Sequence, residues 1–257
     1  MPAPDDHALA ADLAERAGRL LLDLRANGGD PDALRKAGDR QSHEFLMAEL
    51  AAARPGDAVL SEEGTDGKAR LSADRVWIVD PLDGTREFGE AGRDDWAVHV
   101  ALWAREASAG AGDLIAGAVA LPAQGRVLST ASAAGPAPRV AQRPLRMVVS
   151  RTRASQLVKD VAARLQADLV PCGSAGAKVA TVISGENDVY LHSGGFYEWD
   201  TAAPVAVARA SGFHVSRIDG SPVAYNQQDP LLPDILVCRP AIADLLLNAI
   251  GEATYAI

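Results

Sequence analysis

The stretch WIVDPLDGTREF, residues 77–88, carries an apolar run straight into a turn that holds two aspartates. The continuous apolar residues 76–79 are typical of a buried strand. Asp80 follows this strand at once, and Asp83 comes three residues later, directly before Gly84. A surface turn explains the pattern, because Asp before Gly is a common turn signal, and a metal site explains it equally well. The rest of the sequence decides between these two interpretations.

Length and composition describe an ordinary soluble globular protein. The chain has 257 residues, of which 48% are hydrophobic and 23% charged, with a net charge of −9. This length fits one large domain or two smaller ones. The acidic balance disfavours binding to a nucleic-acid polymer. No apolar run approaches the roughly 18 residues of a membrane helix, and the first residues are acidic where a signal peptide is basic. We therefore expect a cytoplasmic protein with no membrane partner.

Cysteine and histidine give no sign of a site of their own. The two cysteines, Cys172 and Cys238, form neither a disulfide framework nor a CxxC metal motif. The five histidines are scattered without ligand-like spacing, which argues against a zinc site.

The pattern along the chain predicts a layered α/β (α+β) fold with sheets covered by helices. We expect helices over residues 5–26 and 40–53, short strands at 58–60 and 76–79, and a longer strand at 96–103. Residues 131–144 are rich in Ala, Pro and Gly, so we place a boundary there. It separates an N-terminal α+β half, residues 1–140, from a C-terminal α/β half, residues 145–257. In the second half strands and helices alternate, with one helix after Asp200.

Carboxylates gather at three strand ends or helix starts. They are Glu62 and Glu63 after the strand at 58–60, Asp80 and Asp83 after the strand at 76–79, and Asp200 before a helix. A carboxylate at a strand end reaches solvent from a rigid element, as a metal site requires. Hard oxygen ligands of this kind select Mg²⁺ or Mn²⁺. Each cluster alone also has a structural explanation: a turn, a solvated acidic pair or a helix N-cap. Their joint pattern favours the metal site.

Three motifs together resemble the inositol monophosphatase superfamily of Mg²⁺-dependent, often Li⁺-inhibited phosphomonoesterases. They are SEE at residues 61–63, DPLDGT at 80–85 and WDTAAP at 199–204, in the order and spacing of that superfamily. The resemblance covers nearly the whole chain. It implies a layered αβαβα sandwich and phosphatase activity. A non-catalytic binding protein with this fold is expected to lack a ligand carboxylate. This chain has all four of them: Glu62, Asp80, Asp83 and Asp200.

The resemblance also implies a ligand set. One metal would be held by Glu62, Asp80 and the carbonyl of Leu82, a second by Asp80, Asp83 and Asp200, and a third, weaker one by Glu62 with Asp39 through water. This amounts to two or three Mg²⁺ ions, for which Mn²⁺ can substitute. Glu62, Thr85 and Asp39 would orient and deprotonate the attacking water. The Thr that often stands shortly before the residue matching Asp39 is absent here.

The expected chemistry follows from charge. A phosphate monoester dianion repels hydroxide, so the site must neutralise both the phosphoryl oxygens and the leaving oxygen. Mg²⁺ ions do this and also lower the pKa of a bound water. Positioning and electrostatics then supply most of the rate, and we expect activity to vanish with EDTA.

Three further segments resemble the 3′(2′),5′-bisphosphate nucleotidase (CysQ-type) branch of the superfamily. They are REF at residues 86–88, VVSRTRAS at 148–155 and GSAGAK at 173–178. An arginine at a strand end can pair with a second phosphate, which would be the role of Arg151. Backbone N–H groups at a helix start can meet an anion, and Lys178 follows in that helix. The implied substrate contacts are Gly84, Thr85, Arg151, Gly173, Ser174, Lys178 and Asp200.

The implied substrate is 3′-phosphoadenosine 5′-phosphate (PAP), and also its sulfated parent PAPS, which links the protein to sulfate assimilation. Ser193 stands where inositol monophosphatases usually place a sugar-binding Glu. The alternative is a broader phosphatase for inositol phosphates or fructose 1,6-bisphosphate. Pro204 departs from the Gly of many relatives; we expect it in the first turn of its helix, where proline is tolerated. A monomer and a homodimer both remain open.

Overall fold

The structure, a computed structural model, describes residues 5–105, 112–135, 144–152 and 154–254. Its first part consists of two long helices and a five-stranded sheet: α1 (Asp6–Ala26), α2 (Pro31–Ala53), β1 (Ala58–Ser61), β2 (Arg75–Asp83), α3 (Thr85–Gly89), β3 (Ala97–Arg105), β4 (Gly112–Leu121) and β5 (Arg126–Ser129), with 3₁₀ turns at Ala69–Ser72 and Pro122–Gln124. The strands lie in the order β1-β2-β3-β4-β5. Only the β1–β2 pair among them is parallel.

The second part alternates strands and helices. Its elements are β6 (Arg146–Ser150), α4 (Gln156–Arg164), β7 (Asp168–Cys172), α5 (Ala175–Ser184), β8 (Val189–Tyr197), α6 (Glu198–Ala210), β9 (His214–Ser216), β10 (Leu231–Cys238), a 3₁₀ turn at Pro240–Ile242 and α7 (Ala243–Thr254). The sheet has the order β7-β6-β8-β10-β9. The division expected near residues 140–145 falls largely on residues 136–143, outside the described residues, so the two halves stay a prediction.

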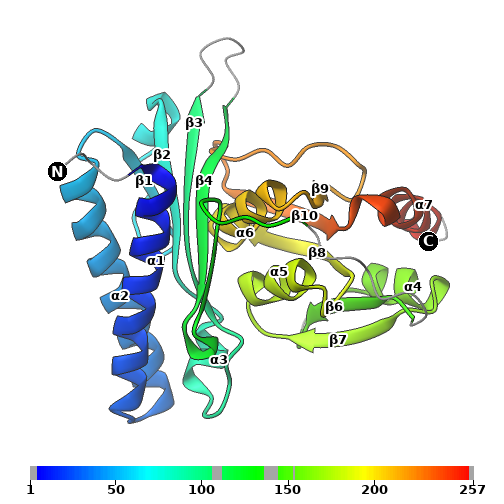
Figure 1. The fold of residues 1–257 in the computed structure, drawn as a ribbon, viewed down its shortest axis with the longest axis horizontal. Coiled ribbons are helices and arrows are strands. Elements are labelled where there is room, and N and C mark those ends of the chain that lie inside the picture. Colours follow the sequence, from blue (N-terminus) through cyan, green and yellow to red (C-terminus); the bar gives the residue numbers. More distant parts are fainter. Residues whose placement is uncertain (1–4, 106–111, 136–143, 153, 255–257) are drawn as a thin grey trace.

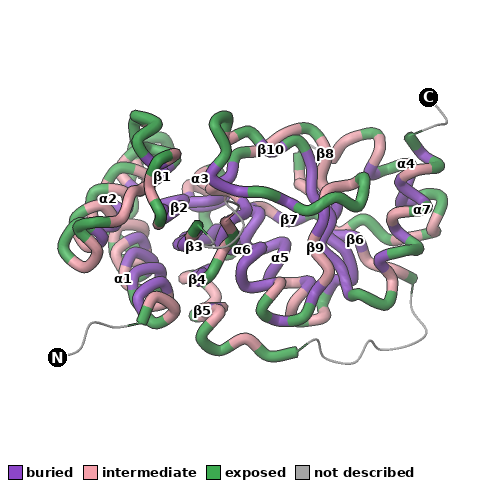
Figure 2. The backbone as a smooth tube through the Cα atoms, turned by 90° about the horizontal axis from the view of Figure 1, so that it is seen from above, coloured by how far each residue is buried: buried purple, intermediate pink, exposed green. Residues whose placement is uncertain are grey.

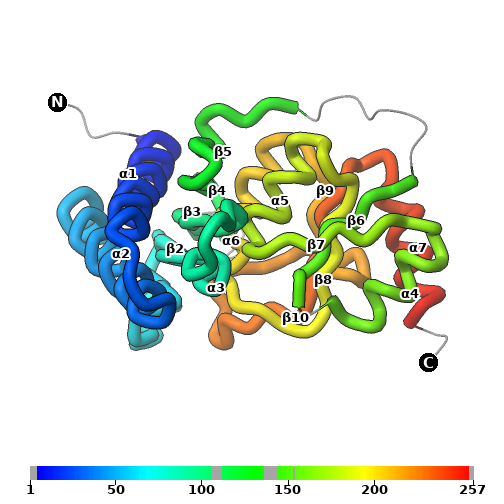
Figure 3. The backbone as a smooth tube through the Cα atoms, turned by 90° about the horizontal axis from the view of Figure 1, so that it is seen from below, coloured from blue at the N-terminus to red at the C-terminus, as the bar shows by residue number. Residues whose placement is uncertain are grey.

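Helices and sheets alternate in five layers (Figure 1). Helices α1 and α2 cover one face of the first sheet, α5 and α6 lie between the two sheets, and α4 and α7 cover the far face of the second sheet. Figure 3 shows the same order from below, with α1 and α7 at opposite ends. The predicted αβαβα sandwich is confirmed.

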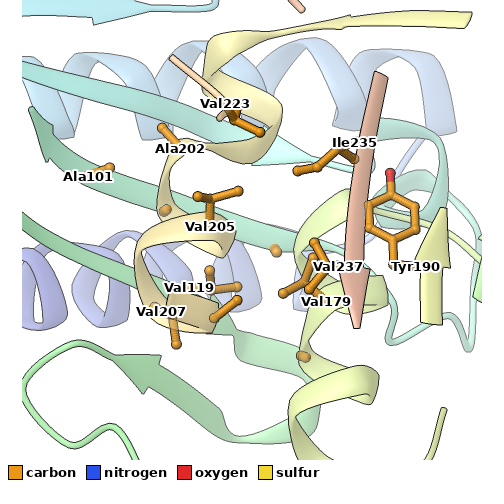
Figure 4. Packing of buried hydrophobic residues seen from close by; sticks show 14 of the residues in the cluster. Ala101, Val119, Val179, Tyr190, Ala202, Val205, Val207, Val223, Ile235 and Val237 are labelled. Atoms are coloured by element: carbon orange, nitrogen blue, oxygen red, sulfur yellow. The ribbon is translucent and has the colours of Figure 1, made fainter. Parts of the chain in front are cut away.

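The central helix layer is buried on both sides. Figure 4 shows apolar side chains of the first sheet (Ala101, Val119), of α6 (Val205) and of the second sheet (Ile235, Val237) in one cluster. Figure 2 shows buried residues along α5, α6 and the strands, and exposed residues along the outer helix α2. Burial of this apolar surface joins the two sheets into one body.

Helix α2 is longer than the sequence pattern predicted. It begins at Pro31 rather than near residue 40, because Asp30 caps it: the Asp30 carboxylate accepts from the N–H of Asp32 (3.1 Å) and Ala33 (3.0 Å). Gly38 then allows close packing, since a Cβ there would lie 2.8 Å from the Phe88 ring. The prediction was wrong over the first two turns, and the added length carries Asp39 within the helix.

Strand β2 also runs further than predicted. It continues past residue 79 to Asp83, and its pairing with β3 shifts register between Asp80 and Asp83. Such a bulge re-aims side chains while the strand stays anchored. The two aspartates therefore stand on the last residues of a buried strand, and the expected strand end at residue 79 was wrong.

Helix α6 begins before Asp200, contrary to expectation. Its N-cap is Tyr197 and its first residue Glu198, so Pro204 lies in the second turn. There its missing N–H would otherwise bond to the carbonyl of Asp200, which corrects the expected first-turn position. Among the described residues, no helix combines the length and the apolar character that crossing a membrane requires.

Candidate active site

One pocket, enclosing about 530 Å³, brings together residues from both parts of the chain. Its ionisable side chains are the acids Glu62, Asp80, Asp83, Glu87 and Asp200 and the bases Arg86, Arg151 and Lys178, with Cys172, Tyr190, His192 and Tyr197. Every predicted site residue lines it except Asp39, which reaches it through a contact with Thr85. The structure thus gathers in one place the motifs that the sequence separates.

The turn around Asp80 and Asp83 is held by backbone hydrogen bonds. The Asp80 carboxylate accepts from the N–H of Leu82 at 3.0 Å, and Asp83 accepts from the N–H of Gly176, at the start of α5, at 2.9 Å. Both aspartates are buried. The second bond ties the end of β2 to a helix of the second part of the chain, so the two metal-ligand candidates have fixed orientations.

The carboxylates of the cluster repel one another. Burial raises the pKa of Asp80 well above its usual range, and the charges of Glu62 and Asp83 raise it further. The pKa of Glu62 is raised to about 7, first by loss of water around its carboxylate and then by the negative charges of Asp200 and Asp83. The residue as a whole is exposed. Buried carboxylates of this kind require protons or cations as compensation. The carboxylates of Glu62, Asp80, Asp83 and Asp200 supply negatively charged oxygen ligands, which hard divalent cations prefer.

Asp39 and Thr85 form a pair at the edge of the cluster. The Thr85 hydroxyl lies 3.2 Å from Asp39 Oδ1 and 3.0 Å from the carbonyl oxygen of Leu82, and its one proton can go to either acceptor. Burial, and secondarily the charge of Glu63, raises the pKa of Asp39 to about 6. Asp39 is thus placed to exchange a proton near neutral pH.

Asp200 lies in the first turn of α6, at its third residue. Its Oδ2 accepts from the backbone N–H of Tyr197 at 2.6 Å. A carboxylate in the first turn also interacts favourably with the helix dipole. The N-cap explanation for this aspartate was wrong, since Tyr197 holds that position. Asp200 does help to close the helix start, and it lines the pocket at the same time.

His99 is a site residue that sequence analysis missed. It is fully buried on β3, in register with Asp80; its Nε2 lies 3.3 Å from Asp83 Oδ2 and its Nδ1 3.2 Å from the carbonyl oxygen of Trp199. Donor atoms of Asp80, Asp83 and His99 lie within 4.8 Å of one another. Burial lowers the pKa of His99. The spacing of the histidines in the sequence gives no sign of this role. Pairing of the strand around His99 with the strand that carries Asp80 would have indicated it.

Close packing at His99 depends on a glycine. A Cβ on Gly176 would lie 2.2 Å from His99 Nε2. The glycine-containing start of α5 therefore packs directly against the imidazole while its N–H bonds to Asp83.

Arg151 lies in the pocket, but its guanidinium is paired with two glutamates. Its nitrogens donate to Glu90 at 2.9 Å through both terminal N atoms, and to Glu87 at 2.7 Å. Glu87 is the middle residue of REF and is buried. The neighbouring Arg86 is exposed and donates to the Thr152 hydroxyl at 3.1 Å. The segment REF thus fixes the position of the SRT segment at residues 150–152.

The backbone N–H groups of Gly173 and Ser174 already have acceptors within the protein. The N–H of Gly173 donates to the Asp95 carboxylate at 2.6 Å, and that of Ser174 to the Asp95 carbonyl oxygen at 3.0 Å. Ser174 caps α5. Gly84 has a φ of +85° and faces this turn, because a Cβ there would lie 3.1 Å from Ser174 Cβ. The positive φ favours glycine at the turn.

Lys178 is buried, although it stands on a helix that opens at the pocket. Its Nζ donates to the carbonyl of Gly173 and lies 5.5 Å from the centre of the Tyr190 ring. Burial lowers the pKa of Lys178, while the charge of Asp83 raises it. The lysine thus places a cation behind the turn that opens α5.

This fold and this site define a layered α/β protein with a carboxylate cluster suited to divalent cations. A family model described as "Inositol monophosphatase family" matches residues 8–255. A Mycobacterium bovis protein named 3′-phosphoadenosine 5′-phosphate phosphatase is 53% identical over 241 residues, which is 92% of this chain and 90% of the relative. A Mycobacterium leprae protein of the same name is 50% identical over 258 residues, covering 96% and 94%.

A solved structure agrees with these matches. CysQ from Bacteroides thetaiotaomicron, described as a bacterial member of the inositol monophosphatase family, superposes with a TM-score of 0.78 at 28% identity, covering 90% of this chain and 96% of the other. The chain belongs to the inositol monophosphatase family.

Proposed function

We propose that this protein is a Mg²⁺-dependent phosphomonoesterase that removes the 3′-phosphate of PAP. The observation that carries the proposal is the cluster of Glu62, Asp80, Asp83 and Asp200 in one pocket, since these charges need cations. The names of the two mycobacterial relatives support PAP as the substrate.

The proposed ligands are those that the family resemblance implies. Glu62, Asp80 and the Leu82 carbonyl would hold one ion, and Asp80, Asp83 and Asp200 a second; a third would contact Glu62, with Asp39 through water. Hard oxygens favour Mg²⁺, with Mn²⁺ as a substitute. When bound, the ions neutralise the phosphoryl and leaving oxygens and acidify the attacking water.

The protein's own groups would orient that water and take its proton. Thr85 Oγ1 can accept from the water while donating to Asp39 Oδ1, at the 3.2 Å separation of this pair. Asp39, whose pKa burial raises to about 6 in the metal-free chain, would be the final acceptor of that proton. Glu62, which lines the same pocket, would also orient the water.

Arg151 is proposed to contact the second phosphate. Glu87 and Glu90 fix its guanidinium, and its buried Nε has no hydrogen-bond partner among the described residues. The guanidinium held in this way lines the pocket, where it would pair with a phosphate oxygen. Gly84, Thr85, Gly173, Ser174, Lys178 and Asp200 complete the proposed substrate contacts.

Finer properties belong to the same proposal. We propose that PAPS is also a substrate, that the protein acts in sulfate assimilation in the cytoplasm, and that Li⁺ inhibits it. Whether it acts as a monomer or a homodimer is left to sizing experiments.

The test is phosphate release from PAP by the purified protein. We expect release in Mg²⁺, loss of release in EDTA, and recovery when Mg²⁺ is restored. Persistent hydrolysis in a metal-free preparation would contradict the metal assignment, and absence of release in Mg²⁺ would contradict PAP as the substrate.

A further inference from the structure

Two aromatic rings form a stacked pair at the rim of the pocket. The rings of Tyr197 and Trp199 are 4.7 Å apart between centroids, with an interplanar angle of 13°. Both residues line the pocket that holds the carboxylate cluster. The Tyr197 residue is 46% exposed, whereas Trp199 packs against the central core. The Trp199 ring thus stacks on one face of the Tyr197 ring.

The backbone holds this pair beside the carboxylate cluster. Tyr197 ends β8 and caps α6, and its N–H donates to Asp200 at 2.6 Å. Across the sheet it pairs with Leu231, which is 49% exposed and lines the same pocket. These are two of only five large apolar side chains that stay exposed in the described part of the chain. Exposed large apolar side chains are thus rare on the described surface, and two of them line this pocket.

An exposed aromatic face with a fixed orientation is suited to a flat ligand group. Nucleobases stack on such faces with little dependence on base identity, because each base has a π-face. The lining of the same pocket also includes Arg86, Thr152 and Arg151, whose donor groups are suited to phosphate oxygens. The pocket lining therefore combines an exposed aromatic face, basic side chains and the carboxylate cluster.

We propose that the Tyr197–Trp199 pair is the platform on which the purine base of the substrate stacks. This proposal rests on the proposed function, and it assigns the base, rather than the phosphates, to this side of the pocket. Tyr197 supplies the face, Trp199 holds the ring, and the N–H bond to Asp200 sets the platform's position relative to the reacting phosphate.

The test compares PAP with its abasic analogue, 1-deoxyribose 3,5-bisphosphate. Tyr197→Ala is expected to raise the KM for PAP about 5- to 150-fold, the range for loss of one base stack, with a much smaller change for the abasic analogue. Tyr197→Phe keeps the ring and is expected to restore the KM for PAP to within about twofold. Leu245→Ala, at an exposed apolar residue of α7 outside the pocket, controls for loss of surface apolar area. Thermal melts of all variants check folding.

The outcomes separate the two proposals. Equal effects of Tyr197→Ala on PAP and the abasic analogue, or no effect on either, would overturn the platform while leaving the proposed function intact. If the unaltered protein releases no phosphate from PAP, the proposed function fails. The platform is then judged by calorimetric binding of AMP against ribose 5-phosphate. Loss of a binding preference for AMP in Tyr197→Ala supports the platform, and an unchanged preference, or none in the unaltered protein, overturns it.

Discussion

The end of β2 and the junction of β8 with α6 line the same pocket, but they are built differently. Asp80 and Asp83 are buried on a central strand, and each carboxylate accepts a backbone N–H. Tyr197, at the other junction, is exposed, and its ring contacts Trp199. The comparison indicates that burial and backbone hydrogen bonds fix Asp80 and Asp83, whereas the Tyr197 ring is held by one aromatic neighbour and stays accessible.

One group of ion pairs joins the two parts of the chain at this pocket. Arg151 of the second part of the chain pairs with Glu87 and Glu90 of the first part. Arg151, the proposed contact for the second phosphate, is thereby given a fixed position by acids next to the turn that carries Asp80 and Asp83. The comparison predicts effects that decrease from the acidic cluster to the rim.

The largest effect is expected from removing a charge from the cluster. Asp83→Asn and Asp200→Asn should each lower kcat/KM for PAP by roughly a hundredfold or more, because the loss of a ligand costs more than the 10- to 100-fold cost of a supporting residue. Circular dichroism checks that both variants fold. Asp168→Asn, at an exposed acid on β7, is the control. Rates near those of the unaltered protein in either cluster variant would refute the metal assignment.

A smaller loss is expected from Asp39→Asn. Removal of a proton acceptor should lower kcat about 100-fold with little change in KM, the lower end of general-base contributions. Steady-state kinetics with PAP measure both constants. A higher KM with unchanged kcat would instead make Asp39 a binding residue.

Arg151→Ala should act mainly on the substrate's second phosphate. We expect KM for PAP to rise about tenfold, since a hydrogen bond to a charged group contributes about 1.5 kcal/mol or more, and KM for inositol 1-phosphate to change less. Arg164→Ala on α4, another partly exposed arginine, serves as the matched control. Equal changes for both substrates would count against the assigned contact.

The smallest effect concerns the stability of the metal-free protein. Because the pKa of Glu62 is raised to about 7 and that of Asp39 to about 6, the folded chain binds protons more tightly than the unfolded chain. Stability is then gained at low pH and lost as the pH rises through about 6 to 7. The Tm in EDTA should be a few degrees higher at pH 6 than at pH 8.

Saturating Mg²⁺ should reduce this difference, because the cations supply the missing positive charge. Glu62→Gln should reduce it in EDTA by removing one of the titrating groups. A Tm in EDTA that is higher at pH 8 than at pH 6 would show that the cluster is not the source of the pH dependence.

The sequence was most informative where the relevant residues lie close together in the chain. DPLDGT marks a turn after a strand, and the structure places both of its aspartates in one pocket with Glu62 and Asp200. The amphipathic pattern of α1 and the alternation of the second half predicted sheets covered by helices, and the family resemblance supplied the order of the five layers. The N-terminus of α2 was missed because its signal was Asp30–Pro31 rather than apolar periodicity.

What the sequence did not reveal depends on contacts distant in the chain. His99 joins the site through strand pairing with Asp80, and Arg151 acquires its two glutamates from residues more than sixty positions away. Pro204 could be placed only after the start of α6 was known. Register and ion pairs of this kind are set by tertiary packing, which local patterns do not encode.

The most direct test of the central claim is a comparison of kcat/KM for PAP, PAPS, inositol 1-phosphate and fructose 1,6-bisphosphate in one Mg²⁺ buffer. We expect the highest value for PAP or PAPS, with loss of all four activities in EDTA. A clearly higher value for inositol 1-phosphate or fructose 1,6-bisphosphate would contradict the proposal that the pocket selects a bisphosphate nucleotide.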